Sequence, residues 1–298
     1  MLNLDGCCNI TDVSALGGVH DLTVSGCYEL TDVSSLGTVH TLHISYCGGI
    51  TDVSGLSGVH SLTLNYCDGI VDVSPLGSVH TLDLRGCANI YDVSGLGNVH
   101  TLILKGCLGL NIDSLRTLGS VHDLDLSTNN ELSDVGSLST VHTLRLVRCP
   151  SLKDVSVLGN VHTLDISGCQ CVQDVSRLGN VHTLKLRGCS AVKDVSALGN
   201  VYNLDLSLCQ NLTDISPFKN VHTLRLDGLN ISDVRYLANV HTLSLRHNKI
   251  ISDVSCLGKL HTLDLSGCDC ITDFSALKNV PRLLTNIHLD YCSISHLY

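Results

Sequence analysis

The chain is poor in the residues and runs that mark many protein classes. It has no tryptophan, one methionine and 3% aromatic residues among its 298 positions, and nowhere do eighteen apolar residues follow one another. A helix that crosses a membrane needs a run of about that length. The opening MLNLDGCC contains neither a basic leader nor an apolar stretch of signal-peptide length. We therefore expect no membrane span and a soluble intracellular protein, most simply a cytoplasmic one.

Chemical motifs are equally scarce. Lysine and arginine total 18 and form no dense basic run, which disfavours a nucleic-acid groove. The P-loop, G-x-S-x-G and H-E-x-x-H motifs are missing, and no unique acid, base or nucleophile stands out. We expect no enzyme activity, no catalytic residue and no cofactor. C-x-x-C is also missing, and Cys169-x-Cys171 and Cys268-x-Cys270 are weak zinc candidates, so no metal ligand is assigned.

The chain does contain one unit of twenty residues, written many times. VHTLDISGCQCVQDVSRLGN begins at Val161 and VHTLKLRGCSAVKDVSALGN at Val181. Units begin at Val19, Val39, Val59, Val79, Val99, Val121, Val141, Val161, Val181, Val201, Val221, Val240 and Leu260. A fixed period of this length indicates a solenoid, which grows in length without enlarging its core. It predicts a single solenoid over 1–298, with a half repeat at 1–18, thirteen repeats at 19–283 and a truncated repeat or cap at 284–298.

The apolar spacing within a unit predicts how each turn of the solenoid folds. Seven positions are apolar, for example Val181, Leu184, Leu186, Cys189, Val192, Val195 and Leu198. The early spacing of two is typical of a strand with one buried face, and the later spacing of three indicates a 3₁₀ or short helical return. Since one turn cannot bury its own faces, we expect an α/β, mostly β, solenoid in which the strands of neighbouring units form a parallel sheet.

Glycine and aspartate recur at positions with mechanical roles. The Gly of S-G-C, as at Gly26, permits the bend that leaves the strand, and the Gly of L-G-N, as at Gly159 or Gly199, is expected to end the helical turn with a positive φ. An Asp precedes Val-Ser-x-Leu in every unit and is expected to accept backbone N–H groups. These fourteen residues are half of the 28 acidic side chains, so the net charge of −10 says little about partners.

The pattern L-x-L-x-x-C/N-x-x-I, as in Leu263–Ile271 and Leu243–Ile251, resembles the leucine-rich repeat signature. The I-T-D-V-S-x-L-G-N that follows is similar to the short repeats of bacterial internalins and of nuclear regulators of protein phosphatase-1. Uniform arrays with Cys at the ninth position also resemble leucine-rich repeat proteins of large DNA viruses and some protists, for which the host cytoplasm would be the location. The resemblance covers the whole chain. It implies a right-handed superhelix with strands on its concave face and 3₁₀ turns on its convex face, which binds protein partners through the concave face.

Two residue types form ladders along the repeats. Cys occupies the ninth position of most repeats and is expected to be a buried free thiol. His occupies the second position of twelve repeats, with Tyr202 in its place once. We interpret this row as stacked, mostly neutral imidazoles at the border of the sheet, with divalent metal binding as the alternative. Neighbouring imidazolium charges would repel, so stability should fall as the pH falls below about 6.5, the ordinary His pKa.

Partner recognition is expected on outward side chains of the strands. From Asp125 to Arg225 the fifth position alternates in sign, which we interpret as a self-neutralising ion ladder before a ligand groove. The remaining candidates are an aromatic patch of His43, Tyr46 and Tyr66 and a basic patch of Arg145, Arg148, Lys185 and Arg187. The first strand lacks a cap and could pair with another copy of the chain, end to end. The sequence thus favours a non-enzymatic scaffold for a protein partner over a structural repeat protein without a partner.

Overall fold

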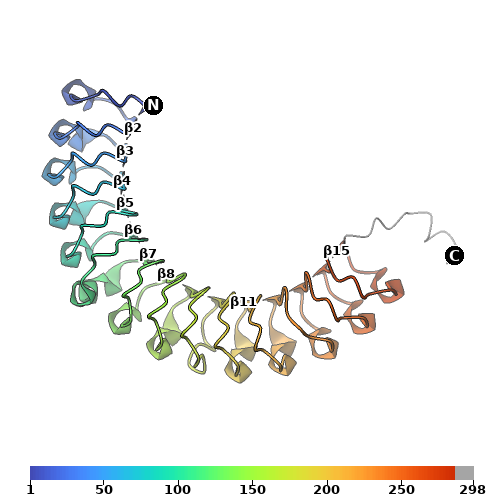
Figure 1. The fold of residues 1–298 in the computed structure, drawn as a ribbon. Coiled ribbons are helices and arrows are strands. Elements are labelled where there is room, and N and C mark those ends of the chain that lie inside the picture. The colour runs from blue at the N-terminus through green and yellow to red at the C-terminus, as the bar shows by residue number, and fades with distance from the viewer. Residues whose placement is uncertain (286–298) are drawn as a thin grey trace. The chain divides into compact units, whose positions relative to one another are not determined.

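The computed structural model describes residues 1–285 in two compact units, Met1–Cys171 and Val172–Tyr298. In both, each repeat contributes one short strand and one tight return, most often a 3₁₀ helix (Figure 1). Within each unit the strands lie on the inner side of the bend and the 3₁₀ turns on its outer side. The leucine-rich repeat architecture expected from the sequence is confirmed. The division into repeats stays a prediction, and its cap at 284–298 falls almost wholly outside the described residues.

The first unit contains these strands: β1 (Leu2–Asp5), β2 (Asp21–Ser25), β3 (Thr41–Ser45), β4 (Ser61–Asn65), β5 (Thr81–Asp83), β6 (Thr101–Ile103), β7 (Asp123–Asp125), β8 (Thr143–Arg145) and β9 (Thr163–Asp165). Its 3₁₀ helices are η1 (Ser14–Leu16), η2 (Ser34–Thr38), η3 (Ser54–Leu56), η4 (Ser74–Ser78), η5 (Ser94–Leu96), η6 (Ile112–Ser120), η7 (Gly136–Leu138) and η8 (Ser156–Asn160).

The second unit contains β10 (Thr183–Lys185), β11 (Asn203–Asp205), β12 (Thr223–Arg225), β13 (Thr242–Ser244), β14 (Thr262–Asp264) and β15 (Arg282–Leu284). Its 3₁₀ helices are η9 (Ser196–Asn200), η10 (Ser216–Asn220), η11 (Arg235–Leu237), η12 (Ser255–Leu257) and η13 (Ser275–Leu277).

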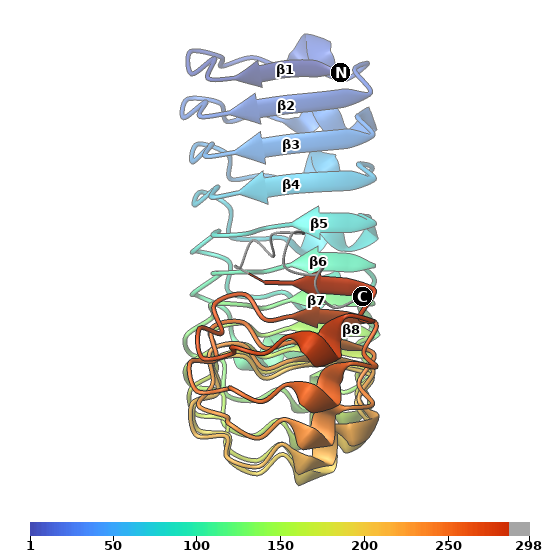
Figure 2. The same cartoon turned by 90° about the vertical axis from the view of Figure 1, so that its right-hand side faces the viewer.

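Within each unit, every strand pairs in parallel with the strand of the next repeat, in register. Leu22 lies opposite Leu42, and Leu42 opposite Leu62, so equivalent positions form rows along the sheet. Figure 2 shows β1–β8 side by side and pointing in one direction. β1 pairs with β2, and its Leu2 and Leu4 are only partly buried. Self-association of the chain through β1 stays a prediction.

The core follows the seven apolar positions that the sequence indicates. In the repeat that begins at Val181 these side chains are at most 2% exposed, and equivalent leucines such as Leu42 and Leu82 are fully buried. The ladder cysteines belong to this core. Cys87 Sγ donates to the carbonyl oxygen of Leu64, 2.8 Å away in the preceding repeat, and Cys107 and Cys169 make the equivalent bond. Burial raises the pKa of Cys67, Cys87 and Cys107 to about 12, which keeps these thiols protonated and unreactive.

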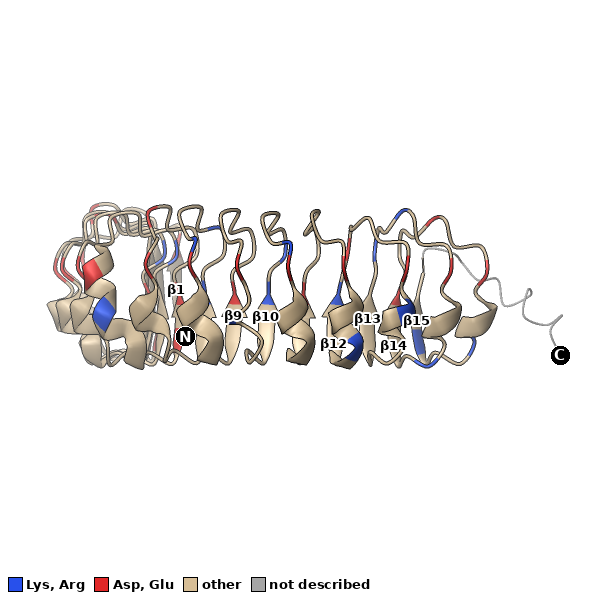
Figure 3. Ribbon diagram, turned by 90° about the horizontal axis from the view of Figure 1, so that it is seen from below, with Lys and Arg blue, Asp and Glu red and all other residues tan. Residues whose placement is uncertain are grey.

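The recurring aspartates close the turn that leads into each return. Asp52 Oδ1 accepts the backbone N–H of Ser54 at 2.8 Å, and this bond lowers the pKa of Asp52. Figure 3 shows the acidic positions repeating along the turns of both units. Asp113 is the exception, because the two extra residues of its repeat shift the turn. There Asn111 Oδ1 accepts the backbone N–H of Asp113, and the carboxylate instead pairs with Arg116 at 2.8 Å.

The two recurring glycines differ in the reason for their presence. Gly26 has φ +71, as expected for the bend after the strand. The expectation of a positive φ for the Gly of L-G-N is wrong, since Gly97 there has φ −61 and Gly199 is not among the residues with positive φ. Close approach of neighbouring repeats explains it. A Cβ on Gly199 would lie 2.6 Å from the carbonyl oxygen of Pro217, too close for any side chain.

Candidate functional site

The second position of the repeats forms a stacked row of imidazole rings at the border of the sheet. Ring centroids of neighbours lie 4.8 Å apart between His40 and His60 and 4.4 Å apart between His122 and His142. The row is mostly exposed and is held by its backbone, as when the N–H of His40 donates to the carbonyl oxygen of His20 at 3.0 Å. The stacking expected from the sequence is therefore present, and every ring keeps an edge open to solvent.

Tyrosine 202 shows that the row tolerates another flat ring. Its ring stacks on His182 at 4.9 Å and on His222 at 4.4 Å. The position therefore requires a ring that can stack, and the imidazole nitrogens are additional to that requirement. In most repeats Nδ1 lies near the hydroxyl of the following Thr, for example 3.4 Å between His142 and Thr143.

A second row begins directly after each strand, at a position with a left-handed backbone. Glycine occupies it in many repeats, but Tyr46 and Tyr66 hold it with φ 56 and 55. Their rings stack at 4.8 Å with an interplanar angle of 2°, and the side chains remain 51% and 43% exposed. A left-handed conformation costs a non-glycine residue about 1–2 kcal/mol. The chain thus presents a flat aromatic surface at positions where glycine would be less strained.

Where a glycine holds this position in the next repeat, the large side chain of the preceding repeat lies over it. A Cβ on Gly86 would clash with the ring of Tyr66, one on Gly168 with Cγ of Arg148, and one on Gly267 with the ring of His247. Positive φ at Arg148 and His247 places both in the same backbone class as Tyr66. The glycine that follows each of them is therefore required twice, by its own φ and by its neighbour.

The candidate partner-binding residues fall into three places. His43 on β3 is exposed and its Nδ1 lies 3.0 Å from the hydroxyl of Thr63, while the stacked pair Tyr46 and Tyr66 follows the ends of β3 and β4. Arg145 and Arg148 are exposed in the first unit, and Lys185 and Arg187 are exposed in the second. The aromatic pair is thus brought into contact, and the four basic residues form one pair in each unit.

The row of alternating charge is in register within each unit. Arg145 lies between Asp125 and Asp165, and Arg225 Nε lies 3.9 Å from Asp205 Oδ2. The aspartates also have backbone partners, since Asp125 Oδ1 accepts the N–H of Ser127 at 2.9 Å. The acidic members therefore help to shape the turn after the strand, which supports a structural role for this row.

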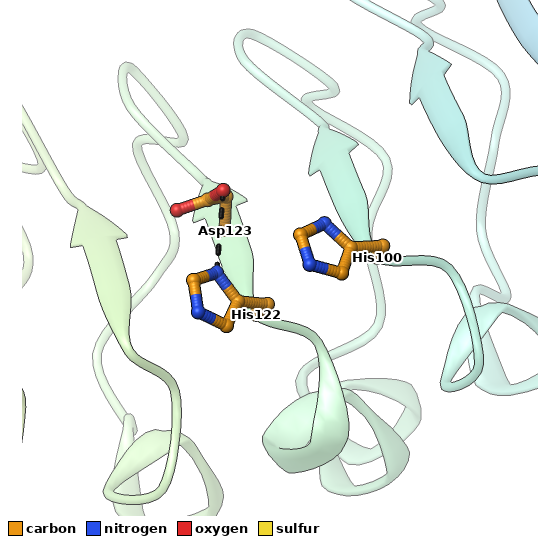
Figure 4. Close-up of side chains that lie close together, drawn as sticks. All are labelled: His100, His122 and Asp123. Atoms are coloured by element: carbon orange, nitrogen blue, oxygen red, sulfur yellow. Dashed lines mark ion pairs between the residues drawn. The ribbon is translucent and has the colours of Figure 1, made fainter.

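Sequence reasoning did not single out Asp123. Its position follows the ladder histidine, and threonine holds it in most repeats. Asp123 Oδ2 lies 3.3 Å from His122 Nδ1, and one donor atom each from His100, His122 and Asp123 lie within 4.8 Å of one another (Figure 4). The only sequence signal was the change from Thr to Asp at one rung of the ladder.

Partial burial of Asp123 raises its pKa, but this is outweighed by hydrogen bonds from Thr143 and His122 and by the nearby imidazoles. The net effect is a pKa below the usual value, so the carboxylate is ionised at neutral pH.

Two other features bear on function. The part of the chain that the structure describes holds no helix long and apolar enough to span a bilayer. A surface hollow of about 270 Å³ on the turn side is lined by Asp174 and Asp194, whose carboxylates already bind backbone N–H groups.

The chain is similar to known leucine-rich repeat proteins in fold. A leucine-rich repeat family model of two copies matches residues 238–279. An internalin, InlF, from Listeria monocytogenes is similar in structure, with a TM-score of 0.58 and 22% identity over 92% of this chain and 82% of that one. A leucine-rich repeat protein of Leptospira interrogans gives a TM-score of 0.62 and 16% identity over 93% of this chain and 87% of that one. No curated protein sequence matches the chain. These likenesses concern the fold alone.

Proposed function

We propose that this chain, a leucine-rich repeat protein by its fold and by the family model that it matches, is a non-enzymatic scaffold that binds a protein partner through its strand face. By strand face we mean the outward side chains of the strands and of the residues that directly follow them. Folds of this kind serve in protein interaction and are not generally catalytic. Function nevertheless belongs to sites and not to folds, so the proposal needs specific residues.

The stacked pair of Tyr46 and Tyr66 carries the proposal. Both side chains are about half exposed, both hold a strained left-handed backbone, and their rings form one flat surface. Strain that persists at an exposed position motivates a functional hypothesis, since glycine would relieve it. Tyrosine is also enriched among residues that dominate the binding energy of interfaces. His43, exposed on β3, widens the same surface with a polar edge.

Quantitative affinity capture with the full chain as bait tests this surface. We expect the Tyr46→Ala/Tyr66→Ala bait to lose the main bound protein, and direct titration of that protein to show at least a tenfold weaker Kd. Tyr28→Ala/Tyr91→Ala is the matched control, because both side chains are exposed, at 65% and 60%, and lie in turns away from the strands. Equal capture by both double variants would refute the aromatic site, and a wild-type bait that retains no specific protein would favour a structural protein with no partner.

The basic residues supply a second, electrostatic component. Arg145 and Arg148 in the first unit, and Lys185 and Arg187 in the second, are suited to an acidic segment of the partner. Charge reversal by Arg145→Glu/Arg148→Glu should slow association and reduce its dependence on salt, because exposed charges steer encounter more than they hold the complex. Unchanged association rates at low salt would show that these residues are not part of the interface.

We also propose a cellular compartment for the protein. Cys7, Cys8, Cys171 and Cys270 are exposed free thiols, a state that persists in a reducing compartment. We therefore place the protein inside the cell. Rapid trapping of thiols during lysis, followed by mass spectrometry, should find these four cysteines reduced; finding them bridged would reject an intracellular location.

A further inference from the structure

We propose that His100, His122 and Asp123 bind a divalent transition-metal ion, for which Zn²⁺ is the best fit. Two imidazole nitrogens and one carboxylate oxygen, with water in the fourth position, form a donor set typical of zinc. In this structure one such atom from each residue lies within 4.8 Å of the other two. Figure 4 shows both rings and the carboxylate gathered at the start of neighbouring strands.

The backbone fixes the spacing of the three ligands. The N–H groups of His122 and Asp123 both donate to the carbonyl oxygen of His100, at 3.1 and 3.0 Å. β6 and β7 therefore hold the two histidines one rung apart, with a ring-centroid distance of 4.7 Å. Because the pairing of the strands is in register, no chain closure is needed to assemble the site. Its ligands are present before the ion arrives.

Asp123 distinguishes this rung from most others. Where threonine follows the histidine, as at His142 and Thr143, the hydroxyl lies near Nδ1 and offers the ion a neutral, weak ligand. At this rung a carboxylate takes that place, 3.3 Å from His122 Nδ1. A carboxylate adds a full negative charge beside two neutral nitrogens, so the ion is held here more tightly than between two histidines alone.

Binding requires one ring to turn. A metal ion lies close to the plane of the imidazole that binds it, and the rings of His100 and His122 are nearly parallel, at 12°. Bonds of about 2.0–2.1 Å from zinc to nitrogen also require the donor atoms to approach one another. Both histidines are exposed, so the rotation is open to solvent, and it gives up the stacking of the turned ring on His80 or on His142. The contact between His122 and Asp123 is exchanged for bonds to the ion, and the site is shallow and reversible.

The chain offers matched controls for two of the three ligands, Asp123 and His100. Asp21 also follows a ladder histidine, with Oδ1 3.0 Å from His20 Nδ1, but among the described residues it belongs to no group of three close donor atoms. Asp21→Thr and Asp123→Thr thus make the same change and restore the residue that most repeats carry. His100→Tyr copies the natural substitution at Tyr202, which keeps the stack, and His60→Tyr is its control.

Isothermal titration of Zn²⁺ into the metal-free full chain at pH 7.4 tests the site, with exposed thiols first blocked because thiolates also bind zinc. We expect one site tighter than any background from the ladder. Asp123→Thr and His100→Tyr should weaken it by at least about tenfold, the loss that even an outer partner of a metal site causes. Asp21→Thr and His60→Tyr should retain it, and circular dichroism should show all four variants folded. Equal isotherms for Asp123→Thr and Asp21→Thr, or equal losses for the two Tyr variants, overturn the proposal.

Discussion

The ring of Tyr66 lies over the backbone of Gly86 in the following repeat, so that a Cβ on Gly86 would meet Tyr66 Cε1 at 2.3 Å. Both residues hold left-handed backbones, with φ 55 and +72. The relationship links two adjacent rungs of the row that follows the strands. The ring of Tyr66 thus stacks on Tyr46 on one side and covers the glycine of the next repeat on the other.

Gly86→Ala should therefore destabilise the protein more than Gly26→Ala. Gly26 has φ +71 with nothing within 4 Å of a Cβ, so its substitution reports backbone strain alone, about 1–2 kcal/mol. At Gly86 the clash adds about 1 kcal/mol or more. Urea unfolding measures both. In the background of Tyr66→Ala, which removes the ring, the cost of Gly86→Ala should fall to that of Gly26→Ala; an unchanged cost would show that the ring does not constrain the glycine.

Exposed cysteines should react with a thiol reagent much faster than the buried ladder cysteines. Burial raises the pKa of Cys87 and Cys107 to about 12, whereas Cys7 and Cys8 are exposed. With Cys292, outside the described residues, changed to Ser, iodoacetamide at pH 8 should rapidly modify Cys7, Cys8, Cys171 and Cys270. The ladder cysteines should react only after denaturant is added. Intact-mass spectrometry counts the adducts, and rapid labelling of a ladder cysteine in the native protein would contradict its place in the core.

Much of the fold could be predicted because the same pattern of residues recurs in thirteen repeats. All seven apolar positions of the unit that begins at Val181 are buried, and the strand and return follow their spacing. The roles of single residues were harder to predict. Asp113 was grouped with the other turn aspartates, but the longer return moves it out of its turn, and Asn111 replaces it. Gly199 looked like the end of a helix, while contact with Pro217 in the next repeat explains it.

The candidate sites show the same limit. Tyr46 and Tyr66 could be found from sequence because aromatic residues are rare here, but their stacking and their left-handed backbones could not. Asp123 was passed over because a change of one residue in a repeat carries little signal until register brings it beside His100. Sequence periodicity predicts which positions share a row, and the distances along that row decide what the row can do.

Alanine substitution of the two asparagines in the cysteine row should destabilise the protein by unequal amounts. Asn248 Nδ2 donates to the carbonyl oxygens of Leu226 and Leu245 at 2.9 and 2.7 Å, and its Oδ1 accepts the N–H of Leu229 at 3.1 Å. Asn129 makes the two donor bonds, but its buried Oδ1 has no partner among the described residues. Asn129→Ala should cost about 1–3 kcal/mol, and Asn248→Ala about 1 kcal/mol more.

Cysteine variants serve as the control for the asparagines. Cys268 Sγ donates to the carbonyl oxygen of Leu245 at 2.9 Å, which shows that a thiol can make the bond between repeats. Asn248→Cys should therefore be more stable than Asn248→Ala in urea unfolding. Equal midpoints for the two would mean that the bond to the preceding repeat contributes nothing measurable.

Stability should fall in two separate steps as the pH is lowered. The pKa of His241 is lowered by loss of hydration and then by the neighbouring His222 and His261, so the folded state binds protons less readily than the unfolded chain. The contribution of His241 is complete above the unfolded pKa of about 6.5 and is lost as the pH falls through the folded value. The turn aspartates have pKa values below 3.8, as at Asp52, so their contribution is lost only in stronger acid.

The melting temperature, recorded from pH 8 to pH 3, separates these steps. We expect a decline between pH 7 and 5 from His241 and a second one below pH 4 from the aspartates. His241→Tyr should lessen the first decline, because the ring continues the stack, as Tyr202 does, without taking up a proton. His43→Gln, outside the ladder, should leave it unchanged. A melting temperature that stays flat from pH 8 to pH 5 would show that stacking between His222 and His261 does not make His241 resist protonation.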